Sequence, residues 1–147
     1  MLLKNIVVSA ACIAATCFNF VAAQAASVSI SNNGGGNILA FAMQTEGYRS
    51  SGTLVKFDGR CDSACTLFLG LPTHQTCISN GAYFRFHSPT SPNLQSERIA
   101  QAYLMRKYPR WVRAWIARKN GLTHNLITMD YEYASKFIHN CGDVASN

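Results

Sequence analysis

Short apolar runs and helical stripes alternate along the first half of the chain. Residues 28–30 predict a short strand that stops at the polar, glycine-rich segment 32–36. Residues 37–44 then carry apolar side chains at a spacing that predicts a buried helix of about two turns. Residues 53–58 predict a second strand.

The next two segments continue this alternation. Residues 63–70 are short and apolar, are followed closely by Pro72, and predict a buried helix. Residues 77–87 predict a third strand, which is broken at Asn80-Gly81.

From Ser96 onward the pattern becomes helical. An apolar stripe at positions 99, 100, 103 and 104 predicts a helix that ends before Pro109, which suits the first position of a second helix. Asn120-Gly121 predicts the end of that second helix. Strands separated by helices imply an α/β fold with a mostly parallel sheet and flanking helices.

The first 25 residues predict a secretory signal peptide and not part of the fold. Lys4 is their only charge, residues 6–23 are apolar and small, and Ala23-Gln24-Ala25 matches a cleavage site. The alternative is a transmembrane anchor, because the uncharged stretch is nearly long enough to span a bilayer. We expect one domain over residues 26–147, in a periplasmic or secreted protein with no stable membrane span after cleavage.

Four cysteines remain after the predicted cleavage. In an exported chain an even number suggests two disulfides, for which three connectivities are possible. A zinc site is the alternative, but the spacing of Cys61 and Cys65 is not matched by a second close pair or by histidines at ligand spacing. We expect no metal and no cofactor.

Charge adds one surface feature. Without Lys4 the chain has 12 Lys and Arg against 7 Asp and Glu, a net charge near +5, and six basic residues lie between Arg106 and Lys119. Such a patch attracts anionic polymers or membranes, or is simply a solvated helix face. No nucleic-acid motif accompanies it, so we expect no nucleic-acid partner.

Three chemical features fall at the ends of the predicted strands: a glycine turn at 34–36, Ser63 after the second strand, and His87 at the end of the third. Sites in parallel sheets gather outside the carboxyl ends of strands. His87 would act as the base that a serine nucleophile needs. Backbone N–H groups of the glycine turn and of Ala64 would hold an oxyanion.

Each feature also has a structural interpretation. The glycines would form an ordinary turn, Ser63 would cap the following helix, and His87 would be a hydrogen-bonded histidine without chemical function. The joint placement of the three features favours a site.

The order of these motifs resembles the Clp protease proteolytic-subunit and crotonase fold. The matching pattern is a glycine turn, then Ser-Ala after a strand, then Phe-x-Phe-His-x-Pro. More specifically, the Cys-x-Ser-Ala-Cys segment resembles small exported bacterial Clp-like proteins. The resemblance covers residues 31–89 well and is thinner afterwards, although residues 108–112 are also typical of the exported group. It implies a Clp/crotonase-like fold, trimmed ahead of the glycine turn.

The resemblance also implies a set of roles. Ser63 would be the nucleophile, His87 the general base, and Gly35 and Ala64 the oxyanion donors. The family supplies a distant aspartate to orient the histidine; Asp130 is the candidate by position and Asp143 a weaker one. The substrate would be a peptide or protein and the assembly a homo-oligomer. The family's ATP-driven unfoldase has no ATP supply outside the cytoplasm, so activity would be ATP-independent.

These observations predict an exported serine peptidase with a Ser63–His87 dyad or triad. The alternative is a catalytically inactive member of the same fold that acts as a binding or interaction module. If the helix from Ser63 runs back along the sheet, Cys77 starts its strand at the end opposite Cys61. The disulfide connectivity that we favour is therefore Cys61–Cys65 with Cys77–Cys141.

Overall fold

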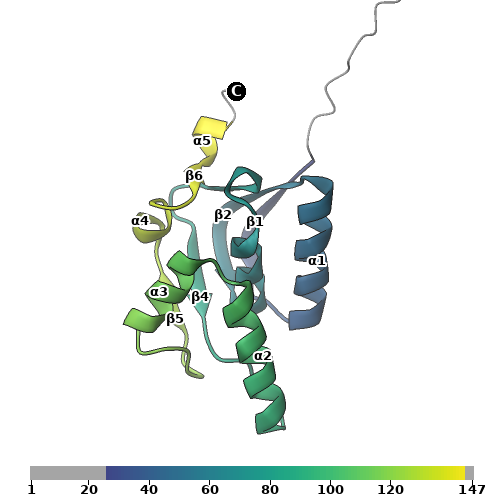
Figure 1. The fold of residues 1–147 in the computed structure, drawn as a ribbon. Helices are drawn as coiled ribbons and strands as arrows, with labels where there is room; N and C mark the ends of the chain where they lie inside the picture. Colours follow the sequence, from purple (N-terminus) through teal and green to yellow (C-terminus); the bar gives the residue numbers. More distant parts are fainter. Residues whose placement is uncertain (1–25, 145–147) are drawn as a thin grey trace, which may run out of the picture.

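The predicted alternation of strands and helices is present in the structure, a computed structural model that describes residues 26–144 (Figure 1). The predicted signal peptide, residues 1–25, lies outside the described residues. In chain order the elements are β1 (Ser27–Asn33), α1 (Ile38–Ser51), β2 (Leu54–Asp62), η1 (Ser63–Gly70), η2 (Thr73–Gln75), β3 (Thr76–Ile78), β4 (Tyr83–Phe86), α2 (Leu94–Lys107), α3 (Arg110–Arg118), β5 (Ile127–Met129), α4 (Tyr131–Ala134), β6 (His139–Asn140) and α5 (Cys141–Val144).

The strands form one sheet in the order β5-β4-β2-β3-β6, and β1 pairs with β2 outside this path. All pairs are parallel except β4 with β5, which confirms the predicted, mostly parallel sheet. Both β3 and β4 pair with β2, one after the other along its length. The break predicted at Asn80-Gly81 falls between them, so β3 and β4 act as one interrupted strand.

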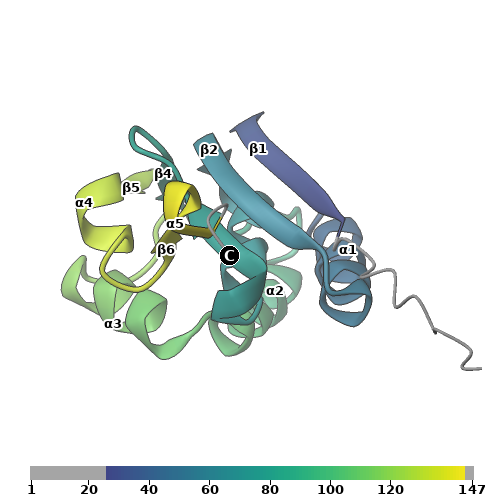
Figure 2. The same ribbon diagram turned by 90° about the horizontal axis from the view of Figure 1, so that it is seen from above.

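The main helices lie on one side of the sheet, as Figure 2 shows for α1, α2 and α3 below β1 and β2. Alternation along the strands explains this arrangement, because successive side chains point to opposite faces. Phe57 on β2 and Phe84 on β4 are fully buried in the core and meet edge to face with ring centroids 4.9 Å apart. Polar side chains of the same strands therefore occupy the opposite face.

The first helix is longer than its apolar pattern predicted, because α1 runs to Ser51. Its ends are defined by caps: the Asn37 side chain accepts a hydrogen bond from the Ala40 N–H, and Gly52 adopts a left-handed conformation after the last turn. The outer face of α1 is exposed, so its second half has no apolar stripe for a sequence pattern to detect. The segment Ser63–Gly70 is helical as predicted but is a 3₁₀ helix.

Two disulfides staple this fold: Cys61–Cys65 joins the end of β2 to η1, and Cys77–Cys141 joins β3 to α5. The connectivity that we favoured is confirmed. The zinc alternative is wrong, since all four sulfurs are committed to disulfides. The longer bridge closes a separation of 64 residues and ties the end of the described chain to the sheet.

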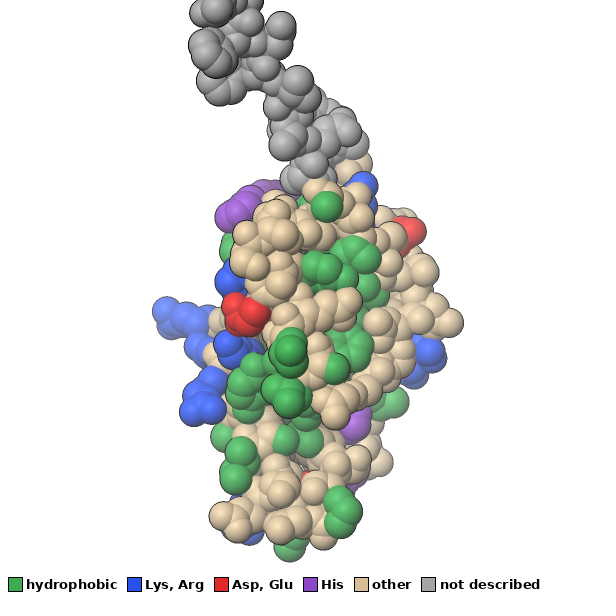
Figure 3. All heavy atoms as spheres, turned by 90° about the vertical axis from the view of Figure 1, so that its right-hand side faces the viewer, with side chains coloured by type: hydrophobic (Ala, Val, Ile, Leu, Met, Phe, Trp, Pro, Cys, Tyr) green, Lys and Arg blue, Asp and Glu red, His purple; other side chains and the backbone are tan. Residues whose placement is uncertain are grey.

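One face of the molecule exposes large apolar side chains. Figure 3 shows hydrophobic side chains gathered on the side of the molecule that carries α1. Leu39 and Met43 on α1 are each 68% exposed, and Ile99 on α2 is 62% exposed. Nowhere between residues 26 and 144 is there a helix long and apolar enough to cross a bilayer.

Candidate functional site

Ser63 stands at a sharp change of direction between β2 and η1. Its φ is +53°, a left-handed conformation that, among the described non-glycine residues, only Ser63 and Asn120 adopt. Such a conformation is costly for serine and is typically retained where the surrounding structure requires it. The capping interpretation is wrong, because Asp62 occupies the cap position and the Ser63 hydroxyl is bonded to His87 instead.

His87 follows β4 and faces Ser63 across the sheet. Its Nε2 lies 2.8 Å from Ser63 Oγ, and its Nδ1 lies 2.7 Å from the carbonyl oxygen of Ser88. A carbonyl oxygen only accepts hydrogen bonds, so Nδ1 carries the ring proton and donates it to Ser88. In the neutral imidazole, Nε2 is then the unprotonated nitrogen and accepts from the Ser63 hydroxyl. This is the tautomer that a general base requires.

The Ser88 carbonyl is itself held in place. The Ser88 N–H donates to the Thr123 carbonyl at 2.7 Å, and Ser88 Oγ lies 3.2 Å from His124 Nδ1. Ser88 is only 8% exposed. The loop after α3 therefore fixes the group that orients His87.

Asp130 is not in position to orient His87. β5 runs antiparallel to β4 with Met129 opposite Phe84, so Asp130 lies near the start of β4 while His87 follows its end. At about 3.3 Å per residue this separates them by roughly 13 Å along the strand. The Asp130 carboxylate instead caps α4 by accepting from the Tyr133 N–H at 2.9 Å. Asp143, on α5, is attached next to the Cys77–Cys141 bridge at the start of β3 and is no closer.

The predicted glycine turn does pack against Ser63. Gly35 has a φ of +80°, and a Cβ placed there would lie 2.5 Å from the Asp62 carbonyl oxygen and 2.8 Å from Ser63 Cβ. Only glycine permits this approach. The Gly35 N–H donates to Asn33 Oδ1 at 2.9 Å. Ala64 is the second residue of η1, where an N–H has no carbonyl of its own helix as acceptor.

A pair of oppositely charged side chains lies beside the Ser63–His87 pair. Asp62 and Arg85 are register partners on β2 and β4. Arg85 binds both carboxylate oxygens, with Nε 2.8 Å from Oδ1 and Nη2 on Oδ2. The hydrogen bond to Asp62 raises the pKa of the Arg85 guanidinium above its ordinary value. Because Asp62 precedes Ser63 and Arg85 lies two residues before His87, this pair fixes the relative position of the two strand ends.

A buried chain of hydroxyl groups supports Ser63 from the core side. Thr66 Oγ1 donates to the Ser63 carbonyl at 2.6 Å and lies 2.7 Å from the Tyr108 hydroxyl. Since the Thr66 proton is committed to Ser63, Tyr108 is the donor to Thr66. Burial raises the pKa of Tyr108 to about 12.

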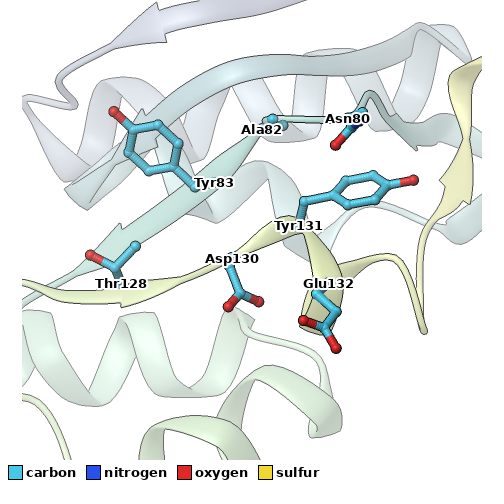
Figure 4. Close-up of a pocket in the computed structure, with 8 residues that line it drawn as sticks. Asn80, Ala82, Tyr83, Thr128, Asp130, Tyr131 and Glu132 are labelled. Atoms are coloured by element: carbon cyan, nitrogen blue, oxygen red, sulfur yellow. The ribbon is translucent and has the colours of Figure 1, made fainter.

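A separate cavity of about 570 Å³ lies near the start of β4. Its lining includes Tyr83, Asp130 and Glu132, and Figure 4 shows the Asp130 side chain directed away from Tyr83. Ser63 and His87 do not line it. The hydroxyl–imidazole pair is thus not part of this cavity.

Sequence reasoning missed three contributors: the Ser88 carbonyl, the Asp62–Arg85 pair and the Thr66–Tyr108 chain. A backbone carbonyl leaves no signal in a sequence. Arg85 did leave one, because it lies within the predicted strand 77–87, two residues before His87, whereas Asp62 lies beyond the predicted strand 53–58. Their pairing depends on the register, which the sequence alone did not provide.

Together the mostly parallel sheet, the flanking helices and the two disulfides define an α/β protein. Among solved structures, the chain is similar to a ClpP1 mutant from Listeria monocytogenes, with a TM-score of 0.51 and 16% sequence identity over 80% of this chain and 75% of that one. No protein-family model matches the sequence, and no curated protein matches it. At this identity the likeness shows the fold alone.

Proposed function

We propose that this protein is an exported, ATP-independent serine peptidase of ClpP-like fold that uses a Ser63–His87 dyad. One observation carries the proposal: Ser63 Oγ lies 2.8 Å from a histidine nitrogen whose partner nitrogen is bonded to the Ser88 carbonyl. That arrangement supplies a nucleophile, a base in the required tautomer, and a group that orients the base.

The mechanism follows from these positions. His87 Nε2 takes the Ser63 proton as Oγ attacks the scissile carbonyl, and the same proton is then given to the leaving amine. Water, deprotonated by His87, then attacks the acyl carbon; the bond to Ser63 Oγ breaks, and His87 returns the proton to Oγ as the carboxylic acid leaves. In this proposal the Ala64 N–H binds the developing oxyanion. The substrate oxygen competes with Asn33 for the Gly35 N–H, since that donor is engaged in the structure described here.

The Ser88 carbonyl orients the imidazole but carries no negative charge. It therefore stabilises the imidazolium less than a carboxylate would, and the proposed dyad is a weak one. We expect turnover slower than that of enzymes with a complete triad. The substrate would be a peptide or protein segment, and a homo-oligomer is part of the proposal by analogy with the fold.

Labelling by a neutral fluorophosphonate probe between pH 6 and 9 tests this proposal, because it needs an activated serine and no known substrate. Ser63→Ala and His87→Ala should each abolish labelling, and the double variant should lose no more than either alone, because the two residues act as a unit. Asp130→Asn is the matched control and should label like the wild type. Melting temperatures within a few degrees of wild type show that the variants are folded.

The hydrolase proposal is refuted if wild-type protein fails to label at any pH in this range, or if His87→Ala labels at the wild-type rate. Export is tested separately by the intact mass of protein recovered from the periplasm. Cleavage after Ala25 is expected, and a full-length, membrane-retained product would contradict it.

A binding module is the second candidate, and the exposed apolar surface of α1 and α2 favours it. A cavity of about 360 Å³ lies between these helices, lined in part by Leu39, Ile99 and Tyr103. The six basic residues of 106–119 are a less specific basis for this function, because several of them have internal partners; Lys107 pairs with Glu46, and Arg113 donates to the Tyr108 carbonyl.

A further inference from the structure

The charged cluster beside Ser63 contains more positive than negative charge. Two arginines, Arg60 and Arg85, share the single carboxylate of Asp62. Arg85 already occupies both carboxylate oxygens with hydrogen bonds. Arg60 Nε lies 3.6 Å from the nearer oxygen, which is an ion-pair distance but not a hydrogen bond.

Arg60 is therefore incompletely partnered. Its Nε is buried and has no hydrogen-bond partner. Within residues 26–144, Asp62 is the one acidic group that forms an ion pair with Arg60. Asp58 lies on the same face of β2 but is exposed. Because that nitrogen is shielded from solvent, a ligand would meet the rest of the guanidinium, whose positive charge Asp62 neutralises only in part.

The position of Arg60 places this affinity beside the proposed nucleophile. A side chain built at Gly34 would come 3.9 Å from Arg60 Nη2, so the guanidinium lies against the glycine turn. The next glycine of that turn contacts Ser63. The Arg60 side chain is 35% exposed, which leaves part of it open to solvent. By the alternation along β2 it points to the face opposite that of the buried Phe57.

We propose that Arg60 binds a carboxylate of the substrate and gives the site a preference for acidic peptides. This inference rests on the proposed hydrolase function and deepens it. The carboxylate is an acidic side chain near the scissile bond or the C-terminal carboxylate of a peptide. Both offer two coplanar acceptor oxygens, the geometry that matches a guanidinium, and both cancel the excess positive charge of the cluster.

A purely structural role does not explain why an arginine occupies position 60. Arg85, the direct register partner of Asp62, holds both carboxylate oxygens without help. A second arginine there adds positive charge that the fold does not compensate. It also occupies the strand position two residues before Asp62, on the same face, where an aliphatic side chain would pack without any unsatisfied donor.

The test compares cleavage of fluorescence-quenched peptide pairs by the full mature protein. One set of pairs differs only in Glu or Gln at a single position on either side of the scissile bond. Another pair differs only in a free or an amidated C-terminus. Wild-type protein should cleave the acidic member of one pair about 10- to 100-fold better in kcat/KM, the range of a charge-assisted hydrogen bond. The pair that responds identifies the source of the carboxylate.

Variants of Arg60 test whether this side chain causes the preference for acidic peptides. Arg60→Gln should reduce the acidic-to-neutral ratio to near one, Arg60→Lys should retain part of it, and Arg60→Glu should favour a Lys-containing peptide instead. Arg110→Gln, an exposed arginine of α3, is the matched control and should leave the ratio unchanged. If Arg60→Gln does not fold, cleavage of the same peptide pairs by wild-type protein and by Arg60→Lys still tests whether Arg60 sets the preference.

The outcomes separate this inference from the proposed function. Wild-type protein that labels with the neutral fluorophosphonate but cleaves both members of every pair equally overturns the role of Arg60 and leaves the hydrolase intact. An equal loss on acidic and neutral peptides in Arg60→Gln also overturns it, since that result shows Arg60 acting only through Asp62. Absence of labelling in the wild type refutes the hydrolase itself.

Discussion

Replacing Gly35 by alanine probes the contact between the glycine turn and Ser63. A Cβ at this position would lie 2.5 Å from the Asp62 carbonyl oxygen, 2.8 Å from Ser63 Cβ and 3.0 Å from the Ala64 nitrogen. Ordinary C···O contacts begin near 3.3 Å, so the turn and the Ser63 segment must separate by about 0.8 Å. The left-handed φ of +80° adds roughly 1–2 kcal/mol of strain for a residue with a Cβ.

The substitution is expected to affect both function and stability. A displacement near 1 Å in a reacting geometry costs roughly 100-fold in rate, and strain and overpacking together lower the unfolding free energy by about 2–5 kcal/mol. Gly35→Ala should therefore be less stable than wild type and label with the fluorophosphonate roughly 100-fold more slowly. Pseudo-first-order labelling rates and thermal unfolding of the same preparations measure the two effects.

Two glycines supply matched controls. Gly34→Ala lies in the same turn, where the nearest atom to a new Cβ is 3.9 Å away, and should label like wild type. Gly81→Ala has a comparable φ of +88° with nothing within 4 Å, so it reports strain without a clash. Labelling of Gly35→Ala within threefold of wild type would refute the reasoning, as would an equal loss in Gly34→Ala.

The two disulfides should contribute differently to stability and to activity. From loop-closure entropy, removing Cys61–Cys65 should lower the unfolding free energy by about 2 kcal/mol and removing Cys77–Cys141 by about 4 kcal/mol. Labelling should nevertheless fall more in the Cys61→Ala/Cys65→Ala variant than in the variant that lacks Cys77–Cys141, because the shorter disulfide restrains the segment around the nucleophile. Denaturation and labelling assays on both variants measure this, and a larger loss of labelling on removal of Cys77–Cys141 would contradict it. Tyr108 should ionise only near pH 12, because burial favours its neutral form and raises its pKa to about 12. The contribution of Tyr108 to the unfolding free energy is fully present below pH 10 and falls by about 3 kcal/mol between pH 10 and 12. Tyrosinate absorbance measures this ionisation. A titration that is complete by pH 11, or one that is unchanged in Tyr108→Phe, would contradict the prediction.

The alternation of apolar segments determined the class of fold. It located the parallel strands, the interruption at Asn80-Gly81 and the two helices that flank Pro109, because burial on one face imposes a period of two on strands and 3.6 on helices. It failed where that period is absent. The second half of α1 has an exposed outer face, and β5 and β6 are two or three residues long, too short to show a period.

The candidate site, like the fold, could be predicted only in part from the sequence. Ser63, His87 and the glycine turn were predicted because each follows a strand, and the carboxyl ends of parallel strands meet at one edge of a sheet. The structure brings Ser63 and His87 to 2.8 Å. Asp130 was chosen as the orienting acid by its place in the chain alone, and the register of β5 places it near the start of β4, away from His87.

Only the tertiary structure decided how His87 is oriented and how the site is charged. The antiparallel register of β5 carries Asp130 to the start of β4, and the loop after α3 brings the Ser88 carbonyl into its place. The register of β2 against β4 likewise pairs Asp62 with Arg85 and leaves Arg60 without a hydrogen bond to that carboxylate. Periodicity is a local property and can be read along the chain, but register and loop closure depend on contacts between segments far apart in the sequence.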